Sequence, residues 1–481
     1  MKLSKLAFAG LLALGMFACA TPTGPVHTGK TSNDFIDLEP HKTTIAAITK
    51  EMTSNKRAYA KMVELCDGIG HRLTGSKNLE KAVQWAVQLM KKEGHENVGT
   101  EEVMVRRWVR GKESVTLLLP REVPLIMLGL GNSMGTPPEG LEADVVVVTD
   151  EKELQALGDK VAGKIVLFNN PMPPWTREEG SHYGHTVRFR VHGPKMAADL
   201  GAIAVLVRSV TAHSLATPHT GTLYYGDAKN KIPGAALTTE DAEMLARMQS
   251  KGERIRVRLK MEARFEGEVP SHNVVAELRG REKPEEIVII SGHLDAWDVG
   301  QGAHDDASGV VMAMEGLNVL RKLGLRPRRT VRVVLWTNEE NGMRGAKGYV
   351  KHHKDELKNH VAALEADSGG FAPDAFGIAI EDKDKEKVAA DQIRAVMGLL
   401  KSVGTISVKP GRSAADVGQL VKAGVPGIGL YTYGAKYFDY HHTHADTVDK
   451  VDPNELARSA AAITALTWLI AELPHKLGEK P

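Results

Sequence analysis

Histidine and carboxylate side chains that can bind a metal ion gather in five short segments of the sequence. These segments are SGHLDAWDVG (291–300), GAHDDASG (302–309), TNEENGMRG (337–345), LEADSGG (364–370) and HHTHADT (441–447). They offer imidazole nitrogens and carboxylate oxygens but no thiolate, a donor set that suits zinc and excludes a closed cysteine site. With this many acidic donors, two ions that share a bridging carboxylate are more natural than one buried ion. Such a pair, about 3.5–4 Å apart, can polarise an amide carbonyl, generate hydroxide and stabilise a tetrahedral oxyanion.

Two adjacent glutamates, Glu339 and Glu340, indicate where this chemistry would find its base. One of them can bind a metal ion while the other faces the water that is to be activated. A free carboxylate beside the metal ions can act as a general base. The residues alone leave open which glutamate takes which role.

Four of the segments follow the ends of expected β-strands, and the fifth, 302–309, opens a helix. Short apolar runs in EEIVIISGH, TVRVVLWTNEE, HVAALEADSG and VPGIGLYTYG alternate with amphipathic stretches such as ASGVVMAMEGLNVLRKLG. Strands that are buried on both faces and separated by helices predict an α/β fold with a mostly parallel sheet covered on both sides. Ligands of such sheets bind at the carboxyl ends of the strands. We therefore expect the five segments to meet at one edge of the sheet.

As a set, the five segments resemble the metal-site motifs of the zinc aminopeptidase and carboxypeptidase superfamily with co-catalytic metals. Within it the chain is most similar to the secreted glutamate carboxypeptidase-like dipeptidases, from about residue 45 to residue 470. The resemblance implies a zinc exopeptidase fold, a mixed, mostly parallel sheet sandwiched by helices. It also implies that residues 127–262 are an inserted protease-associated α/β domain between catalytic parts 42–126 and 263–475.

The resemblance also assigns roles to the candidate residues. It makes Asp305 the carboxylate that bridges two Zn²⁺ ions per chain, and Glu339 the general base. Asp295 would fix the imidazole of a metal-binding histidine from behind. The remaining metal ligands would be His293, Glu340, Asp367 and His442.

Residues that would contact the substrate are less sharply marked. The segment GRSAADVGQLVKAGVPGIGL (411–430) is similar to the substrate-side loop of the family. Within it, Arg412 and Asp416 are available to hold a charged peptide terminus. His441 and His444, on either side of the expected ligand His442, are further candidates for the pocket.

Several of the polar side chains also have ordinary structural explanations. Asp305 and Asp306 could each cap a helix, which is the explanation we favour for Asp306. Five histidines of the middle region are expected to be solvated, namely His182, His185, His192, His213 and His219. An aromatic group could equally pack in the core or line a pocket, and it comprises Tyr431, Tyr433, Tyr437, Phe438 and Tyr440.

The N-terminus predicts export. Lys2 and Lys5 precede the apolar run LAFAGLLALGMFA (6–18), the order of a secretory signal peptide (1–20) that is too short for a membrane span. Cys19 stands where a bacterial lipoprotein carries its lipid, although cleavage after Ala20 also fits. We therefore expect a periplasmic or extracellular protein, either anchored to a membrane through lipidated Cys19 or released. Residues 21–41 are expected to form a flexible tether.

The cysteine count and the charge balance limit what else the protein can be. Apart from Cys19 only Cys66 remains, so no intramolecular disulfide can form, and Cys66 is expected to be a buried, inert thiol. The 62 Lys and Arg residues nearly balance the 60 Asp and Glu residues, which gives no bulk field for nucleic acid. Short peptides are the expected partners, and the resemblance adds a homodimer.

The leading functional prediction is a metallo-exopeptidase that acts on dipeptides or on the ends of short peptides. One alternative is a binding ectodomain that keeps the fold without catalysis. Another is an acyltransferase of the glutaminyl-cyclase type on the same fold. Release of free amino acids from a dipeptide would separate the first hypothesis from the other two.

Overall fold

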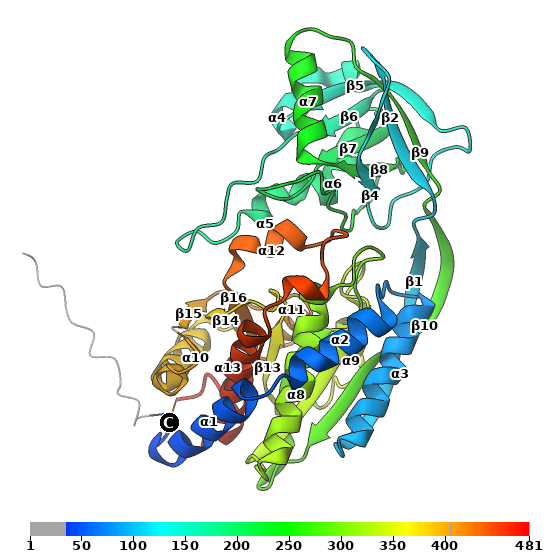
Figure 1. Ribbon diagram of the computed structural model, residues 1–481. Coiled ribbons are helices and arrows are strands. Elements are labelled where there is room, and N and C mark those ends of the chain that lie inside the picture. The colour runs from blue at the N-terminus through cyan, green and yellow to red at the C-terminus, as the bar shows by residue number, and fades with distance from the viewer. Residues whose placement is uncertain (1–34, 405, 481) are drawn as a thin grey trace, which may run out of the picture.

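Two eight-stranded sheets, linked by a long antiparallel strand pair, form the two lobes of the computed structural model (Figure 1). The structure describes residues 35–404 and 406–480. The predicted signal peptide, Cys19 and most of the predicted tether lie outside these residues. Phe35 and Ile36 are buried and α1 (Glu39–Thr53) has begun before residue 42, so the folded chain starts earlier than the sequence predicted. No helix in the described part of the chain is long and apolar enough to cross a membrane.

The sheet of the main lobe is mixed, as predicted. Its order is β1 (Glu96–Val109), β10 (Arg264–Leu278), β12 (Arg329–Trp336), β11 (Lys283–His293), β13 (His360–Ala366), β16 (Gly427–Thr432), β14 (Pro373–Ala379), β15 (Ser407–Pro410). The four central strands β12, β11, β13 and β16 are parallel, whereas β10 and β14 flank them in antiparallel orientation. The central parallel strands therefore send their carboxyl ends to one edge.

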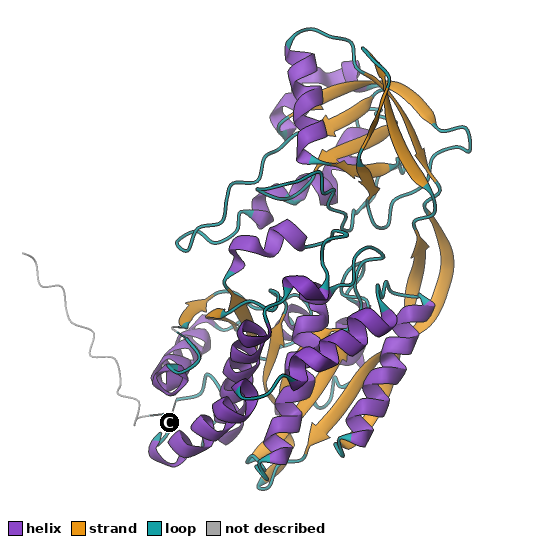
Figure 2. Ribbon diagram, in the orientation of Figure 1, coloured by secondary structure: helices purple, strands orange, loops and turns teal. Residues whose placement is uncertain are grey.

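Helices cover both faces of this sheet (Figure 2). In β11, Val288 and Ile290 pack into one core, while Ile287 and Ile289 pack into a second core on the opposite face, because successive side chains alternate across a strand. The first core is closed by α1, α2 (Arg57–Ile69), α3 (Lys77–Lys92), α8 (Ser308–Lys322), α10 (Lys383–Val396) and α13 (Pro453–Glu472). The second core is closed by α9 (Arg344–His352) and α11 (Val417–Val421). Cys66 of α2 is buried, and burial raises the pKa of its thiol to about 12.

The second lobe, which we define as residues 113–261, contains the other sheet. Its order is β3 (Val123–Leu125), β2 (Glu113–Leu119), β9 (Arg256–Met261), β5 (Leu141–Val148), β6 (Ile165–Phe168), β7 (Ala204–Arg208), β8 (Gly234–Leu237), β4 (Met127–Gly129). One face packs on α7 (Thr239–Ser250), and the other packs on α4 (Glu151–Leu157) and α6 (Arg188–Ala198). Because β2 pairs with β9, this sheet begins 14 residues before position 127, where the sequence placed the boundary. That the lobe is a protease-associated insert stays a prediction.

Short helices complete the chain, and two of them lie near the edge where the central strands end. These are η3 (Ala303–Ala307), just before α8, and α12 (Tyr437–Tyr440), just before the HHTHADT segment. The others are η2 (Gly158–Val161), α5 (Tyr183–Thr186), η4 (Leu357–Asn359), η5 (Met397–Leu400), η6 (Gly434–Lys436) and η7 (Val448–Lys450).

Candidate metal centre

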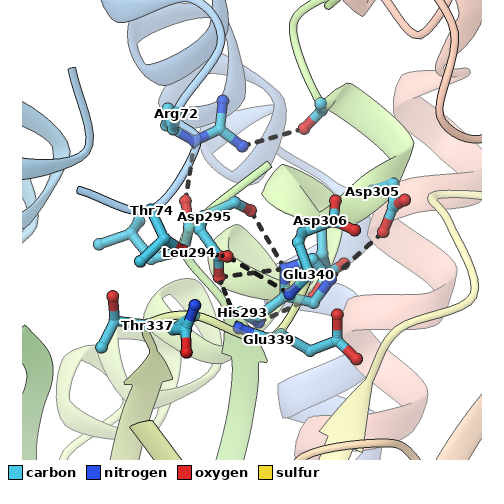
Figure 3. Close-up of polar contacts among 12 residues, drawn as sticks. Arg72, Thr74, His293, Leu294, Asp295, Asp305, Asp306, Thr337, Glu339 and Glu340 are labelled. Carbon is cyan, nitrogen blue, oxygen red and sulfur yellow. Dashed lines mark hydrogen bonds and ion pairs between the residues drawn. The ribbon is translucent and has the colours of Figure 1, made fainter. Parts of the chain in front are cut away.

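The structure brings the five polar segments together at the carboxyl ends of the central strands, and Figure 3 shows residues from three of them, 291–300, 302–309 and 337–345. His293 is the last residue of β11, while Glu340 and Asp367 follow β12 and β13. His442 comes after β16 and α12, and Asp305 lies in η3. All five are within one cluster of side chains because parallel strands end at the same edge of the sheet.

Asp305 lies between the two imidazoles. Its Oδ1 is 3.2 Å from Nε2 of His293, and its Oδ2 is 3.0 Å from Nε2 of His442. On the first side, Asp367 Oδ1 is 3.6 Å from the same His293 nitrogen. On the second side, Glu340 Oε2 is 3.1 Å from the same His442 nitrogen. The donors therefore form two groups that share one carboxylate.

Backbone carbonyls fix the tautomer of both imidazoles. Nδ1 of His293 is 3.1 Å from the carbonyl of Asp295, and Nδ1 of His442 is 3.2 Å from the carbonyl of Thr220. A carbonyl oxygen only accepts, so each Nδ1 carries a proton, and each Nε2, the nitrogen that faces the carboxylates, is the one left for a metal ion. This is the tautomer that a metal ligand requires. The Thr220 carbonyl comes from the second lobe.

The Asp295 carboxylate lies on the Nδ1 side of the His293 ring, and its expected role of fixing that ring from behind stays a prediction. Its Oδ1 is 3.7 Å from the His293 ring, so the Asp295 carbonyl rather than the carboxylate makes the close contact. The carboxylate accepts hydrogen bonds from the Thr74 hydroxyl (2.8 Å) and from the backbone N–H groups of Glu339 (3.1 Å) and Glu340 (3.4 Å) (Figure 3). Asp295 therefore holds the loop that carries both glutamates.

The loop around Asp305 is fixed by residues that the sequence analysis did not single out. The buried carboxylate of Asp446 accepts hydrogen bonds from the backbone N–H groups of His304 (2.7 Å) and Asp305 (3.1 Å). The guanidinium of Arg72, also buried, donates to the carbonyls of Leu294, Gln301 and Gly302 (Figure 3). Asp446 stands in the HHTHADT segment and could have been found there, whereas nothing in the sequence around Arg72 marks it.

Asp306 caps a helix, the role favoured from the sequence. Its Oδ1 accepts from the backbone N–H of Gly309 (2.8 Å), and its Oδ2 accepts from the backbone N–H of His293 (3.1 Å). The peptide bond between Asp305 and Asp306 is cis. Asp306 thus ties the start of α8 to the end of β11.

The crowding of carboxylates and imidazoles shifts the pKa values of the cluster. Burial raises the pKa of Glu340 to about 7, and the neighbouring Asp305 charge adds to this. Burial alone would lower the pKa of His442, but Glu340 and Asp305 raise it to about 9. Burial, followed by Asp367 and Glu340, raises the pKa of Glu339 well above its usual range, against the opposing effect of His293. The cluster therefore carries more negative charge than its own histidines offset.

A cavity of about 890 Å³ opens above the cluster, with walls from both lobes. Of the predicted substrate contacts, Arg412 and His441 line it. Asp416 does not line the cavity and is fully buried, so the expectation that it faces substrate is wrong. Burial, followed by the neighbouring Glu365 carboxylate, raises the pKa of Asp416 well above its usual range. His444 is exposed and lies outside the cavity lining.

The structure also shows where His219 and the aromatic group lie relative to the cavity. His219 was expected to be solvated but is buried, because its segment lies against the HHTHADT segment of the main lobe. The aromatic group divides: Tyr431, Tyr437 and Phe438 line the cavity, whereas Tyr433 is partly exposed and packs on Trp175.

Comparison with known proteins agrees with this geometry. The protein-family model described as "Peptidase family M28" matches residues 273–467, the part of the chain that contains the five segments. Carboxypeptidase Q of Bos taurus is 41% identical over 434 residues, which cover 90% of this chain and 89% of the bovine one. Carboxypeptidase Q of Homo sapiens is 41% identical over 424 residues, 88% of this chain and 87% of the human one.

The chain belongs to peptidase family M28. It is a metallo-exopeptidase, so the two alternative functions weighed from the sequence are not favoured. The crystal structure of a peptidase M28 precursor from Shewanella amazonensis SB2B superimposes with a TM-score of 0.86 at 32% identity, over 92% of this chain and 100% of that chain. A zinc aminopeptidase from Bacillus subtilis shares the fold, with a TM-score of 0.62 at 20% identity over 85% of this chain and 93% of that chain.

Proposed function

We propose that this M28 peptidase binds two zinc ions and hydrolyses dipeptides, or removes terminal residues from short peptides. The observation that carries the proposal is the position of Asp305, whose two oxygens face two separate imidazoles. His293 and Asp367 would hold one ion, His442 and Glu340 the other, and Asp305 would bridge them. Imidazole and carboxylate donors without thiolate suit zinc in a catalytic site.

The donor set also fits a pair of cations on electrostatic grounds. Within the described residues, Glu340 Oε1 is buried without a hydrogen-bond partner, and the buried Asp305 Oδ2 meets only imidazole nitrogens, those of His441 and His442. In the described chain, Asp305, Glu340 and Asp367 form ion pairs with histidines and with no lysine or arginine. Because buried carboxylates are costly unless they are paired or coordinate a metal, the cluster requires positive charge from outside the chain.

Glu339 is the residue to which we assign the proton transfer. Its backbone is held by Asp295, and its side chain lines the cavity beside the metal ligands. When bound, the zinc ions would polarise the scissile carbonyl and make a water molecule acidic near neutral pH. Glu339 would then accept the proton of that water and return it to the leaving amine.

Arg190 of α6 is the cation we propose for the free carboxylate of the substrate. It lines the cavity although it is only 4% exposed. Its guanidinium donates to the Tyr183 hydroxyl (2.8 Å) and to the Thr220 carbonyl (3.2 Å), and it has no carboxylate partner within the described residues. A buried guanidinium with only neutral partners favours an anionic ligand, and arginine binds carboxylates through two parallel hydrogen bonds.

Amino-acid release from unblocked dipeptides tests the reaction. We expect hydrolysis that a chelator abolishes and zinc restores. Glu339→Gln should lower kcat by about 10²- to 10⁴-fold, the usual contribution of a general base, while the zinc content stays the same. A Glu339→Gln enzyme that keeps full activity would overturn the assignment of the base, and a chelator-insensitive enzyme would overturn the metal mechanism.

The role of Arg190 is tested separately by comparing dipeptides with their amides. Arg190→Met should raise KM for free dipeptides at least 10-fold more than it raises KM for dipeptide amides, because only the free acid offers the carboxylate. Arg188→Met is the matched control, since this neighbour in α6 pairs with Glu151 and lies outside the cavity lining. Equal hydrolysis of acids and amides by the unaltered enzyme would point to recognition of the amino end instead.

A further inference from the structure

The second lobe completes the environment of His442. We infer that the Thr220 segment is a positioning element of the metal centre, which sets the zinc affinity of the position that His442 and Glu340 would form. This inference rests on the proposed function, because it takes His442 as a zinc ligand.

Thr220 and His442 make two hydrogen bonds with each other. His442 Nδ1 donates to the Thr220 carbonyl at 3.2 Å, and the Thr220 N–H donates to the His442 carbonyl at 3.0 Å. The first bond orients the ring and the second fixes the backbone that carries it. Partners of this kind raise the basicity of a metal-binding imidazole and lock its direction.

Thr220 is itself held from several sides. Its hydroxyl donates to the Gly129 carbonyl at 2.7 Å and accepts from Arg110 at 3.3 Å, while its carbonyl also accepts from Arg190 at 3.2 Å. Arg110 in turn forms a two-bond pair with Asp298, at 2.6 and 2.8 Å. Because Thr220 is fully buried and Asp298 belongs to the main lobe, hydrogen bonds to both lobes fix the carbonyl that His442 needs.

The two imidazoles differ in where their support comes from. The carbonyl that fixes His293 belongs to Asp295, two residues further along the same loop. The carbonyl that fixes His442 is 222 residues away in the sequence and lies in the other lobe. A change at Thr220 should therefore weaken one of the two zinc positions and spare the other.

Two substitutions displace this carbonyl to different degrees. Thr220→Val removes the hydroxyl that bonds Gly129 and Arg110 but keeps the side-chain shape. Gly221→Ala acts more strongly, because Gly221 has a φ of +134°, which L residues rarely adopt, and a Cβ there would lie 2.3 Å from Cζ of Arg190. The matched control is Thr238→Val, a buried threonine of the same lobe whose hydroxyl caps α7 away from the cavity.

Zinc binding is measured by competition with a chromophoric chelator on the metal-free full chain. The unaltered protein and Thr238→Val should both bind two ions. In Thr220→Val one of the two dissociation constants should rise about 10-fold, and in Gly221→Ala about 100-fold, the range known for outer partners of metal ligands. Thermal unfolding of the metal-free proteins shows whether each variant is folded. If Gly221→Ala does not fold, the result for Thr220→Val decides the test.

The outcomes separate the two proposals. Two unchanged dissociation constants in folded Thr220→Val, or equal weakening of both positions, would overturn the role of the Thr220 segment and leave the proposed function standing. An unaltered protein that binds no zinc would overturn the proposed function and this inference with it.

Discussion

His293 and His442 present the same nitrogen to the shared carboxylate of Asp305, although carbonyls from different lobes fix them. Carboxylates that surround two such nitrogens can serve either one ion or two. The position of Asp305 supports the proposed pair of ions, because its oxygens point to different rings while Asp367 is close to one ring only.

Substitutions of the two aspartates should therefore differ in zinc stoichiometry. Asp305→Asn should weaken both zinc positions by more than about 100-fold, since loss of a ligand charge costs more than loss of an outer partner. Asp367→Asn should weaken only one. Zinc per chain after dialysis against a weak chelator measures both effects. Two ions retained by Asp305→Asn would contradict a bridging role.

A residue far from the centre gives a pH-dependent prediction. Burial lowers the pKa of His360 to about 4, and its ring is 2.8 Å from the Tyr349 hydroxyl and 3.1 Å from the Glu356 carbonyl. The unfolded chain has a histidine pKa of about 6.5. Between these values the unfolded state binds a proton that the folded state does not, so stability falls as pH drops from about 6.5 towards 4.

His360→Gln should remove this contribution and flatten the dependence, by up to about 1.4 kcal/mol per pH unit. Denaturant unfolding of the metal-free protein between pH 7 and pH 4.5 measures the slope. His185→Gln, a change at an exposed histidine, is the control and should leave the slope unchanged. Parallel slopes for the unaltered protein and His360→Gln would refute the assignment.

A site residue could be predicted from the sequence when its own segment shows that it stands at the edge of the sheet. It could not be predicted when its role depends on contact with a distant segment. The ligand candidates and Glu339 stand at strand ends, where residue type and fold logic coincide. Thr220 and Arg190 acquire their roles only when the lobes meet, and a polar loop sequence carries no sign of that contact. The same limitation made His219 look solvated, whereas Asp416 looked available to substrate although it is buried beside Glu365 within the main lobe.

At the scale of elements, the start of α8 is fastened to the end of β11. Asp306 accepts one hydrogen bond from the first turn of α8 and one from the His293 N–H. Asp306 therefore caps α8 and also fixes the position of α8 relative to β11, the strand that ends at the proposed ligand His293.

Asp306→Ala should lower the free energy of unfolding of the metal-free protein by about 2–4 kcal/mol, through a lost cap and an unsatisfied buried N–H group. Asp306→Asn keeps one acceptor and should cost clearly less. Denaturant midpoints at constant m-value provide the measurement. A loss below about 0.5 kcal/mol in the alanine variant would mean that water replaces both bonds.

The elements of the main sheet could be predicted further than those of the second lobe. The apolar runs of β11, β12, β13 and β16 are buried on both faces, so the sequence signals both their type and their parallel order. β2 looked like part of the preceding region because it is close to β1 in the sequence. Its partner β9 lies more than 130 residues away, and pairing at that distance leaves no local pattern.

At the scale of the whole molecule, one tryptophan joins the lobes. Trp297 of the main lobe packs into the core of the second-lobe sheet, in edge contact with Trp108 at 6.5 Å and with His442 at 5.6 Å. The lobes approach so closely there that a Cβ on Gly131 would lie 1.9 Å from the Trp297 ring. The interface is therefore a continuation of the protein core.

Trp297→Ala should cost about 3–5 kcal/mol, as expected for a large aromatic residue removed from a core. Trp297→Phe, which fills most of the space, should cost less than half of this. Calorimetric unfolding measures the loss and also shows whether the lobes still unfold in one transition. A single unshifted transition for Trp297→Ala would show that the lobes are held together elsewhere.

The Thr220–His442 contact limits how far the two lobes can move apart. A hydrogen bond of 3.2 Å is lost once the atoms separate by a few tenths of an ångström more. A hinge motion wide enough to admit a peptide between the lobes would therefore break this bond. If the lobes stay closed during turnover, substrate enters and product leaves through the open side of the cavity, and moving the lobes apart would weaken the zinc position that we propose at His442.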